Sequence, residues 1–261
     1  MYEYNFKKED RMDNIERQII YGRNSVFEAL SSDKEIDTLF VQKNVQLGGI
    51  VPTAKKRGIV VKDVSAEKLS AMCGTTKHGG VAAELCAAEY AALDDILTVS
   101  EKNGTPPFII IADEIADPHN LGAIIRSAEA AGADGVIIPK RRSASLNSTV
   151  FKTSAGAAAW IKVARVSNLV DTIKVLKKRN IWVYGMEADG EPYDKTDLTG
   201  GTAIVVGSEG FGLGRLVRES CDAVVSLPMN GRVNSLNASV SAGILMYEIV
   251  RQRQNKRQCG K

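Results

Sequence analysis

The sequence has few of the residues on which metal sites, disulfide frameworks and stacking surfaces depend. Its 261 residues include 4 cysteines, 2 histidines and an aromatic fraction of 6%. The cysteines are scattered without a CxxC pair, and only His78 and His119 accompany them, so neither a zinc site nor a disulfide framework is predicted. This cysteine usage fits a reducing cytoplasm, and no metal is expected.

Long apolar runs are also missing. The opening residues, MYEYNFKKEDRMDNIERQ, lack the apolar core of a signal peptide. No apolar run approaches the roughly 20 residues that a membrane-spanning helix needs. The sequence therefore predicts a soluble cytoplasmic protein with no membrane partner, and its charged opening at 1–18 predicts a flexible arm.

The composition is that of an ordinary folded protein, with 44% hydrophobic and 25% charged residues. This length allows one large or two ordinary domains, and the low aromatic content favours α/β layering. The net charge of +3 permits a nucleic-acid partner without requiring one. Through Ser100 there are 13 basic and 15 acidic residues, against 21 and 16 in the remainder, so the positive surplus lies in the C-terminal part.

Residues 19–95 alternate short helical and extended patterns and predict a small α/β domain. The helices are predicted at 26–30, 50–56 and 66–72, and the strands at 38–42, 60–64 and 81–87. The segment SEKNGTPP then collects a glycine and two prolines, which favour turns and end a helix. We therefore place a linker at 96–106.

Residues 107–261 predict a second α/β domain, because their strands are continuously apolar and are therefore expected in a parallel sheet buried on both faces. Ligands bind such sheets beyond the carboxyl ends of the strands. Strands are predicted at 108–113, 135–139, 181–186, 202–207 and 223–228, and helices at 121–131 and 238–253. Three of the loops that follow these strands carry chemistry.

The first loop leads into the helix of DEIADPHNLGAIIRSAEAAG. Asp117 and Pro118 favour a helix start. Leu121, Ile124, Ile125 and Ala128 recur at helical spacing and form a buried stripe that leaves Arg126 outside it. Arg126 is then either a solvated surface residue or a functional cation that reaches back toward Asn120.

The second loop, in TAIVVGSEGFGLG, has four glycines after a buried strand. Glycines let a backbone approach a ligand closely. The loop has neither the GxxxxGK[ST] pattern of a P-loop nor the GxGxxG fingerprint of dinucleotide-binding enzymes. Glu209 is either a solvated turn carboxylate or a group that orients a cation such as Arg126.

The third loop, in SLPMNGRVNSLNASVSAGILMYE, follows the last predicted strand and precedes the last helix. Its polar run of Ser235, Asn237 and Ser239 suits helix capping. Three polar residues exceed what one cap needs, so a functional role stands beside the structural one.

Together, NLGAIIRSAEAAG, VVGSEGFGL and LPMNGRVNSLNASVSAGI resemble, in this order, the three signature motifs of SpoU-type RNA 2′-O-ribose methyltransferases of the SPOUT superfamily. The resemblance covers Phe108–Arg253. The N-terminal segments YGRNSVFEAL and KHGGVAAEL are similar to the L30e-like substrate-binding domain of the branch that methylates a guanosine of 23S rRNA. His78-Gly79-Gly80 departs from that branch, whose members usually carry Gln in the middle.

The resemblance implies S-adenosylmethionine as methyl donor, 23S rRNA or its precursor as substrate, a deep trefoil knot in the C-terminal sheet, and a homodimer in which both subunits help to form each site. It implies a cofactor pocket formed by Gly207, Gly210, Leu227, Met229 and Leu236. It also implies a catalytic group that consists of Asn120, Arg126, Glu209, Ser235 and Asn237.

The role of Arg126 stays open between two mechanisms. Family accounts make the arginine the general base. A guanidinium stays protonated in proteins, so Arg126 could instead hold the neighbouring phosphate and stabilise the developing alkoxide, with Glu209 orienting it. Ser235 and Asn237 are expected to hydrogen-bond the loop or the ribose.

Other functions compete with methylation of 23S rRNA. A tRNA ribose methyltransferase is the alternative within the class, and a non-catalytic rRNA-binding or ribosome-assembly protein is the alternative outside it. A nucleotide-dependent dehydrogenase is disfavoured by the missing fingerprint. For RNA contact, the local basic segments are 140–142 and 55–57.

Overall fold

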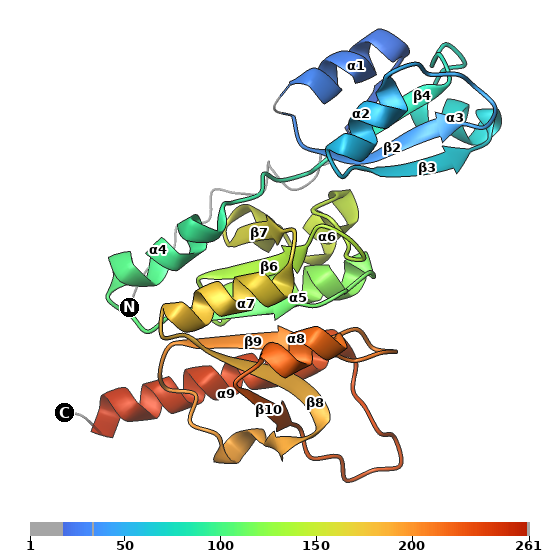
Figure 1. Ribbon diagram of the computed structural model, residues 1–261. Coiled ribbons are helices and arrows are strands. Elements are labelled where there is room, and N and C mark those ends of the chain that lie inside the picture. Colours follow the sequence, from blue (N-terminus) through green and yellow to red (C-terminus); the bar gives the residue numbers. More distant parts are fainter. Residues whose placement is uncertain (1–17, 33, 260–261) are drawn as a thin grey trace. The chain divides into compact units, whose positions relative to one another are not determined.

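The structure of the protein is a computed structural model that describes residues 18–32 and 34–259 (Figure 1). The flexible arm predicted at 1–18 therefore lies outside the described residues, apart from Gln18. The chain divides into two units, and the first consists of the chain up to Glu89 together with Ser145–Ser148. Each unit has its own sheet, of four strands in the first and six in the second.

The N-terminal unit, which also takes in Ser145–Ser148, is built on a sheet with the strand order β1-β4-β2-β3. Alternating side chains give this sheet two apolar faces. Leu39 and Val41 pack with residues of α1 and α2, whereas Phe40 between them packs with Leu69 of α3. The elements are β1 (Ile19–Tyr21), α1 (Arg23–Ser31), β2 (Ile36–Gln42), α2 (Ile50–Lys56), β3 (Val60–Val64), α3 (Ala66–Cys73) and β4 (Val81–Leu85).

The stretch 96–106, predicted as a linker, instead holds most of helix α4 (Leu93–Asn103), which belongs to the second unit. Ile96 and Leu97 are buried in the core of that unit. The backbone N–H of Ala92 donates to the Asp95 carboxylate at 2.9 Å, which fixes the first turn. The Gly and Pro signals mark only where this helix ends, and the boundary between the units precedes it.

The C-terminal unit has a six-stranded, fully parallel sheet in the order β10-β8-β9-β5-β6-β7, which confirms the predicted sheet type. Its strands are β5 (Phe108–Ala112), β6 (Gly135–Pro139), β7 (Lys162–Val166), β8 (Trp182–Pro192), β9 (Thr202–Val206) and β10 (Ala223–Ser226). Its helices are α5 (Pro118–Ala130), α6 (Ser148–Thr153), α7 (Leu169–Lys178), α8 (Arg215–Ser220) and α9 (Ala238–Cys259), together with 3-10 turns at Ala157–Ala159 and Tyr193–Lys195.

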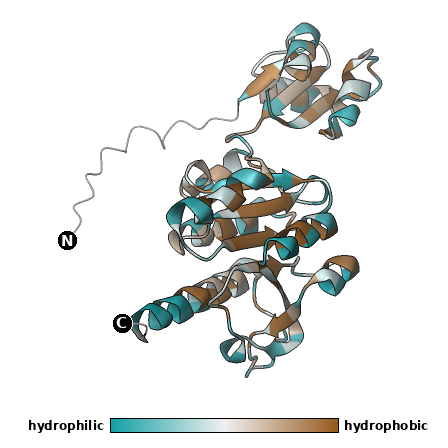
Figure 2. Ribbon diagram, turned by 60° about the vertical axis from the view of Figure 1, so that its left-hand side comes forward, coloured by the Kyte–Doolittle hydropathy of each residue, from teal (hydrophilic) through white to brown (hydrophobic). Residues whose placement is uncertain are grey.

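The central strands of this sheet are buried on both faces, and Figure 2 shows them as the most hydrophobic part of the unit. Ile109 and Ile111 pack with side chains of α4, α7 and α8. The pleat turns Ile110 to the opposite face, where α5 and α9 pack against each other. From β5 the chain builds the sheet outward through β6 to β7 on one side, whereas the later strands β8, β9 and β10 lie on the other side of β5. The strand order therefore reverses at β5, and the loops beyond its carboxyl end lie at this switch point.

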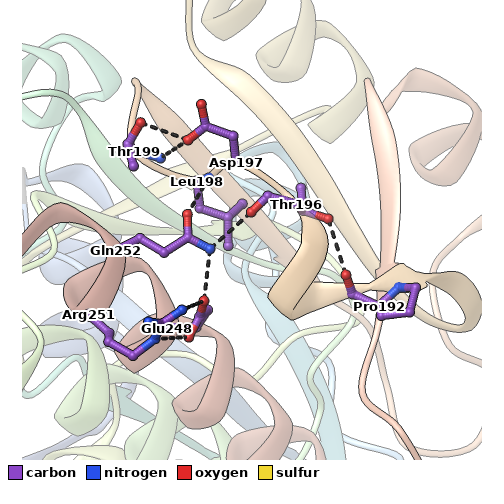
Figure 3. Close-up of polar contacts among 8 residues, drawn as sticks. All are labelled: Pro192, Thr196, Asp197, Leu198, Thr199, Glu248, Arg251 and Gln252. Atoms are coloured by element: carbon purple, nitrogen blue, oxygen red, sulfur yellow. Dashed lines mark hydrogen bonds and ion pairs between the residues drawn. The ribbon is translucent and has the colours of Figure 1, made fainter. Parts of the chain in front are cut away.

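A polar network ties α9 to the chain that precedes β9 (Figure 3). The Gln252 side chain donates to the Thr196 carbonyl at 3.0 Å and accepts from the Leu198 N–H at 2.9 Å. Its amide also donates to the Glu248 carboxylate at 2.8 Å, to which the Arg251 guanidinium donates at 2.6 and 2.7 Å. This network holds α9 in place, and the first turn of α9 carries the end of the third motif.

We expect Glu248→Gln to lower the free energy of unfolding by about 2 kcal/mol at pH 7, because Glu248 is buried and accepts three charge-assisted or amide hydrogen bonds. The hydrogen bonds from Arg251 lower the Glu248 pKa below its usual 4.5. This contribution is therefore full above about pH 4.5 and is lost as the pH falls through the lower folded-state pKa. Urea unfolding of wild type and Glu248→Gln measures the difference in the free energy of unfolding at pH 7 and at pH 3.

Glu219→Gln is the matched control, because the Arg215–Glu219 pair at 3.2 Å is exposed and such pairs contribute only about 0.5 kcal/mol. A difference between wild type and Glu248→Gln that stayed the same at both pH values would contradict the assigned role of the Glu248 charge.

Candidate active site

The three loops singled out in the sequence meet at one edge of the parallel sheet. Residues 113–117 follow β5, residues 207–214 follow β9, and residues 227–237 follow β10. β5 and β9 pair in register, with Ala112 opposite Val206, so the first two loops leave the sheet side by side. Parallel strands end at the same edge, and the third loop joins them there.

Three predicted side chains, one from each of the three motifs, meet in one cluster. The Asn120 amide donates to the Glu209 carboxylate at 3.2 Å, and the Asn237 amide donates to the Asn120 side-chain carbonyl at 2.8 Å. The Asn237 amide also donates to Glu209. Two neutral amides therefore hold one carboxylate and leave its second oxygen to other donors.

Asn237 also caps α9. Its side-chain oxygen accepts from the N–H groups of Ser239 at 3.0 Å and Val240 at 3.3 Å, and from the Ser239 hydroxyl at 2.6 Å. The capping role considered for the polar run is thus taken by Asn237, which also contacts Asn120 and Glu209. Since the cap fixes the Asn237 amide, the helix start positions the donor that contacts Glu209.

Arg126 lies on α5, outside the buried stripe of Leu121, Ile124, Ile125 and Ala128, as the spacing predicts. Its side chain is exposed. Among the described residues no hydrogen bond or ion pair joins Arg126 to Glu209, and the proposed orientation of Arg126 by Glu209 is not seen. The guanidinium is available to an anion that arrives from solvent.

The glycine loop after β9 is a tight, braced turn. Ser208 and Gly212 exchange two backbone hydrogen bonds, at 2.9 and 3.1 Å. A Cβ on Gly207 would lie 2.3 Å from the backbone of Gly212, so only glycine fits there. The two ends of the turn are therefore in direct backbone contact.

Two carboxylates that the sequence analysis did not single out hold the far side of this turn. The Leu213 N–H donates to Glu187 of β8 at 2.6 Å, and the Gly214 N–H donates to Asp113 at 2.7 Å. Burial raises the pKa of the Asp113 carboxyl against the opposing effect of the Gly214 N–H. Asp113 directly follows a buried strand and could have been suspected; Glu187 carries no such signal.

A pocket lies between the glycine loop, the middle of β8 and the third loop. Four of the residues predicted for the cofactor line it: Gly207, Leu227, Met229 and Leu236. Of the predicted catalytic residues, Glu209 and Ser235 also line it. Gly210 is exposed and is not among the lining residues, because it sits on the outer part of the turn. The structure adds the apolar side chains of Met186, Val206 and Val225.

Within residues 18–32 and 34–259, no group of three or more His, Cys, Asp or Glu side chains is arranged to hold a metal ion. In the same part of the chain, no helix is long and apolar enough to cross a membrane.

Comparison with known proteins assigns both units. Residues 107–247 match the SpoU rRNA Methylase family, and residues 19–91 match the RNA 2′-O ribose methyltransferase substrate binding domain. The chain belongs to the SpoU rRNA methylase family. The resemblance seen in the three motifs is thereby confirmed, and the protein is an RNA 2′-O-ribose methyltransferase.

Relatives of this SpoU chain are similar over nearly their whole length. YacO of Bacillus subtilis (strain 168), named a TrmH family tRNA/rRNA methyltransferase, is 47% identical over 238 residues, which cover 90% of this chain and 95% of YacO. An AdoMet-bound rRNA methyltransferase from Sinorhizobium meliloti is 26% identical, with a TM-score of 0.57 over 89% of this chain and 86% of its own.

The SpoU methyltransferase AviRb from Streptomyces viridochromogenes, solved with AdoMet, has a TM-score of 0.59 over 91% of this chain and 90% of its own. At 24% identity this likeness is one of fold. It agrees with the parallel sheet and the preceding substrate-binding unit described above.

In the SpoU substrate-binding unit, Arg57 is a structural residue. Its guanidinium donates to the carbonyls of Leu30 at 2.7 Å, in the last turn of α1, and of Ser32 at 3.0 Å and Lys34 at 2.9 Å, beyond its end. These carbonyls lack partners within the helix, so Arg57 caps it. Within the basic segment 55–57, the Arg57 guanidinium is therefore occupied by structural hydrogen bonds.

The His78-Gly79-Gly80 segment, which departs from the expected pattern, is also part of the fold. His78 is buried, and its Nδ1 accepts from the Gly80 N–H at 3.1 Å. A neutral ring then carries its proton on Nε2, which lies 3.1 Å from the Ser70 hydroxyl. The Gly79 carbonyl accepts from the Arg23 side chain at 3.1 Å, so this turn joins α1 and α3.

Proposed function

We propose that this SpoU enzyme transfers the methyl group of S-adenosylmethionine to a guanosine 2′-oxygen of 23S rRNA, in the cytoplasm. The observation that carries the proposal is the position of Glu209. It lines the pocket and is held by Asn120 and Asn237, so that the polar cluster lies at the wall of the cofactor site. Transfer needs this arrangement, because the reacting oxygen must lie beside the methyl group.

The pocket fits S-adenosylmethionine. Apolar side chains of Leu227, Met229 and Leu236 provide walls for the adenosyl group, and the bare backbone at Gly207 allows close approach. The cofactor supplies an electrophilic methyl group on a sulfonium. Glu209 belongs to the polar cluster and also lines this pocket, where its negative charge favours a cationic ligand.

The remaining task of the protein is to prepare the ribose hydroxyl. A 2′-hydroxyl is a weak nucleophile and must be aligned while its proton leaves. Arg126 is exposed and unpaired among the described residues, so it can bind the neighbouring phosphate and stabilise the developing alkoxide. Ser235 lines the pocket, and its proposed role is to hydrogen-bond the ribose.

The substrate-binding unit favours rRNA over tRNA, because it adds RNA contact area to the methylase domain. The alternative is a tRNA ribose, and a non-catalytic ribosome-assembly role is disfavoured by the intact cluster. The basic segment 140–142 is proposed to contact RNA; its Arg142 pairs with Glu114 at 2.9 Å, which leaves Lys140 and Arg141 to phosphates.

The deciding experiment is methyl transfer from radiolabelled S-adenosylmethionine to unmodified transcripts of 23S rRNA and, separately, of tRNA. We expect label in 23S rRNA, at a guanosine that mass spectrometry of nuclease digests identifies as 2′-O-methylated. Label in tRNA alone would replace the rRNA proposal with its alternative. Label in neither RNA would favour the non-catalytic role.

The homodimer belongs to the same proposal. Val240, Ile244 and Tyr247 form an apolar stripe along α9, with exposed fractions of 50%, 37% and 54%. A stripe at this spacing is suited to a partner helix. Sedimentation equilibrium measures the mass, and a monomer at micromolar concentration would contradict the dimer. The trefoil knot stays a prediction from the family resemblance.

A further inference from the structure

Phe211 is the most exposed large apolar side chain among the described residues, with 96% of its surface accessible. It lies at the tip of the glycine loop, two residues after Glu209 and directly before Gly212. A solvated turn does not require an aromatic residue, and a fully exposed phenyl ring gains nothing from the fold. The position therefore calls for a ligand outside the chain.

The loop holds Phe211 on a rigid support. Ser208 and Gly212 close the turn with two hydrogen bonds on either side of the tip. Beyond it, the Leu213 and Gly214 N–H groups are held by Glu187 and Asp113. Because the backbone beneath Phe211 is braced, only the side-chain rotamer remains to be fixed when a flat ligand binds, which suits a stacking platform.

The surroundings identify the ligand. Ser208, Glu209 and Gly212 line the cofactor pocket, whereas Phe211 between them does not, so its ring is directed away from the cofactor. Arg232 is an exposed cation in the third loop, which forms part of the pocket wall. Arg126 is an exposed cation on α5, the helix that follows the first loop at the same edge of the sheet. An aromatic face accompanied by cations beside a methyl-transfer site suits a nucleobase with its phosphates.

We propose that Phe211 stacks on a nucleobase that lies next to the nucleotide whose ribose is methylated. This inference rests on the proposed methyl transfer to RNA, but it holds for either an rRNA or a tRNA substrate. It assigns Phe211 to substrate binding and not to the chemical step. Stacking is tolerant of base identity. Phe211 therefore contributes to RNA affinity and to the position of the RNA in the site more than to discrimination between base sequences.

The test compares Phe211→Ala with Phe211→Trp on the RNA that the wild type methylates, with 23S rRNA and tRNA transcripts both tried. Loss of one stacked base predicts a rise in the KM for RNA, or in the Kd from filter binding, of roughly 5- to 150-fold for Phe211→Ala. We expect kcat at saturating RNA and the calorimetric affinity for S-adenosylmethionine to stay within about threefold. Phe211→Trp should restore wild-type RNA affinity.

Trp182→Ala is the matched control. Trp182 is also an exposed aromatic residue, at 58%, but it begins β8 at the amino edge of the sheet, opposite the loops. It should leave the KM for RNA unchanged. A Phe211→Ala variant with unchanged RNA affinity would overturn the inference, whether or not 23S rRNA proves to be the substrate. A wild type without methyl transfer would instead overturn the proposed function.

A second measurement separates RNA from a second copy of the chain as the occupant. With p-benzoylphenylalanine at position 211, ultraviolet light should crosslink the full-length protein to the substrate RNA near the methylated nucleotide. A crosslink to the partner subunit, with a raised dimer dissociation constant for Phe211→Ala, would show that the ring belongs to a protein interface and would overturn the inference.

Discussion

Arg126→Ala is expected to lower kcat for methyl transfer by about 10²- to 10⁴-fold while the affinity for S-adenosylmethionine stays unchanged. The side chain lies outside the buried stripe of α5 and does not line the pocket, so neither the fold nor the cofactor site depends on it. What is lost, on the proposed mechanism, is the cation that holds the phosphate and stabilises the alkoxide as it forms. Single-turnover kinetics measure the rate, and isothermal titration calorimetry measures cofactor binding.

Arg126→Lys keeps the charge but loses the planar fork, so it should recover only part of the activity. The control is Arg179→Ala. Arg179 is exposed and pairs with Glu101 at 3.3 Å, and it lies at the end of α7, before the amino edge of β8. Its loss should leave kcat unchanged. Calorimetry that showed weakened cofactor binding in Arg126→Ala would contradict the separation of roles.

The fold was predictable where the sequence has strong local signals. The apolar strands at β5, β6 and β9 are buried on both faces, as their composition indicates. The helix α7 was missed, although Leu169, Thr172, Ile173 and Leu176 are buried at helical spacing. The neighbouring strand β7, with the sequence KVARV, is interrupted by Lys162 and Arg165 and so lacks the continuous apolar run of the other strands.

The residues of the site could be predicted, because family motifs mark them, but the contacts among them could not. Asn120, Glu209 and Asn237 lie in three separate motifs, and their hydrogen bonds depend on strand order, which has no local signal. The Glu187 bond to Leu213 joins residues 26 positions apart through β8, and nothing at either position indicates it. The same holds for Arg57, which is a surface residue by sequence and a helix cap in the structure.

Substitutions at two glycines of one loop test whether its shape, and not merely its glycine content, forms the cofactor site. Gly207→Ala places a Cβ at 2.3 Å from backbone carbon and oxygen of Gly212 and at 2.6 Å from the Leu213 nitrogen. Backbone atoms cannot rotate aside, so the turn must open and displace Glu209. We expect this overpacking to cost about 1–3 kcal/mol, seen as a 5- to 150-fold loss of affinity for S-adenosylmethionine.

Gly210→Ala is the matched change in the same turn. No atom lies within 4 Å of a Cβ at Gly210, and its φ is outside the left-handed region, so alanine fits without strain. Calorimetry should find the cofactor affinity of Gly210→Ala within about threefold of wild type. The midpoint of thermal unfolding should fall in Gly207→Ala and stay unchanged in Gly210→Ala. Equal losses in both variants would mean that Gly210 contacts the cofactor, as the family resemblance implied, and that the pocket extends over the tip of the turn toward Phe211. Loss only in Gly207→Ala would confine the cofactor to the inner side and leave the outer side to RNA.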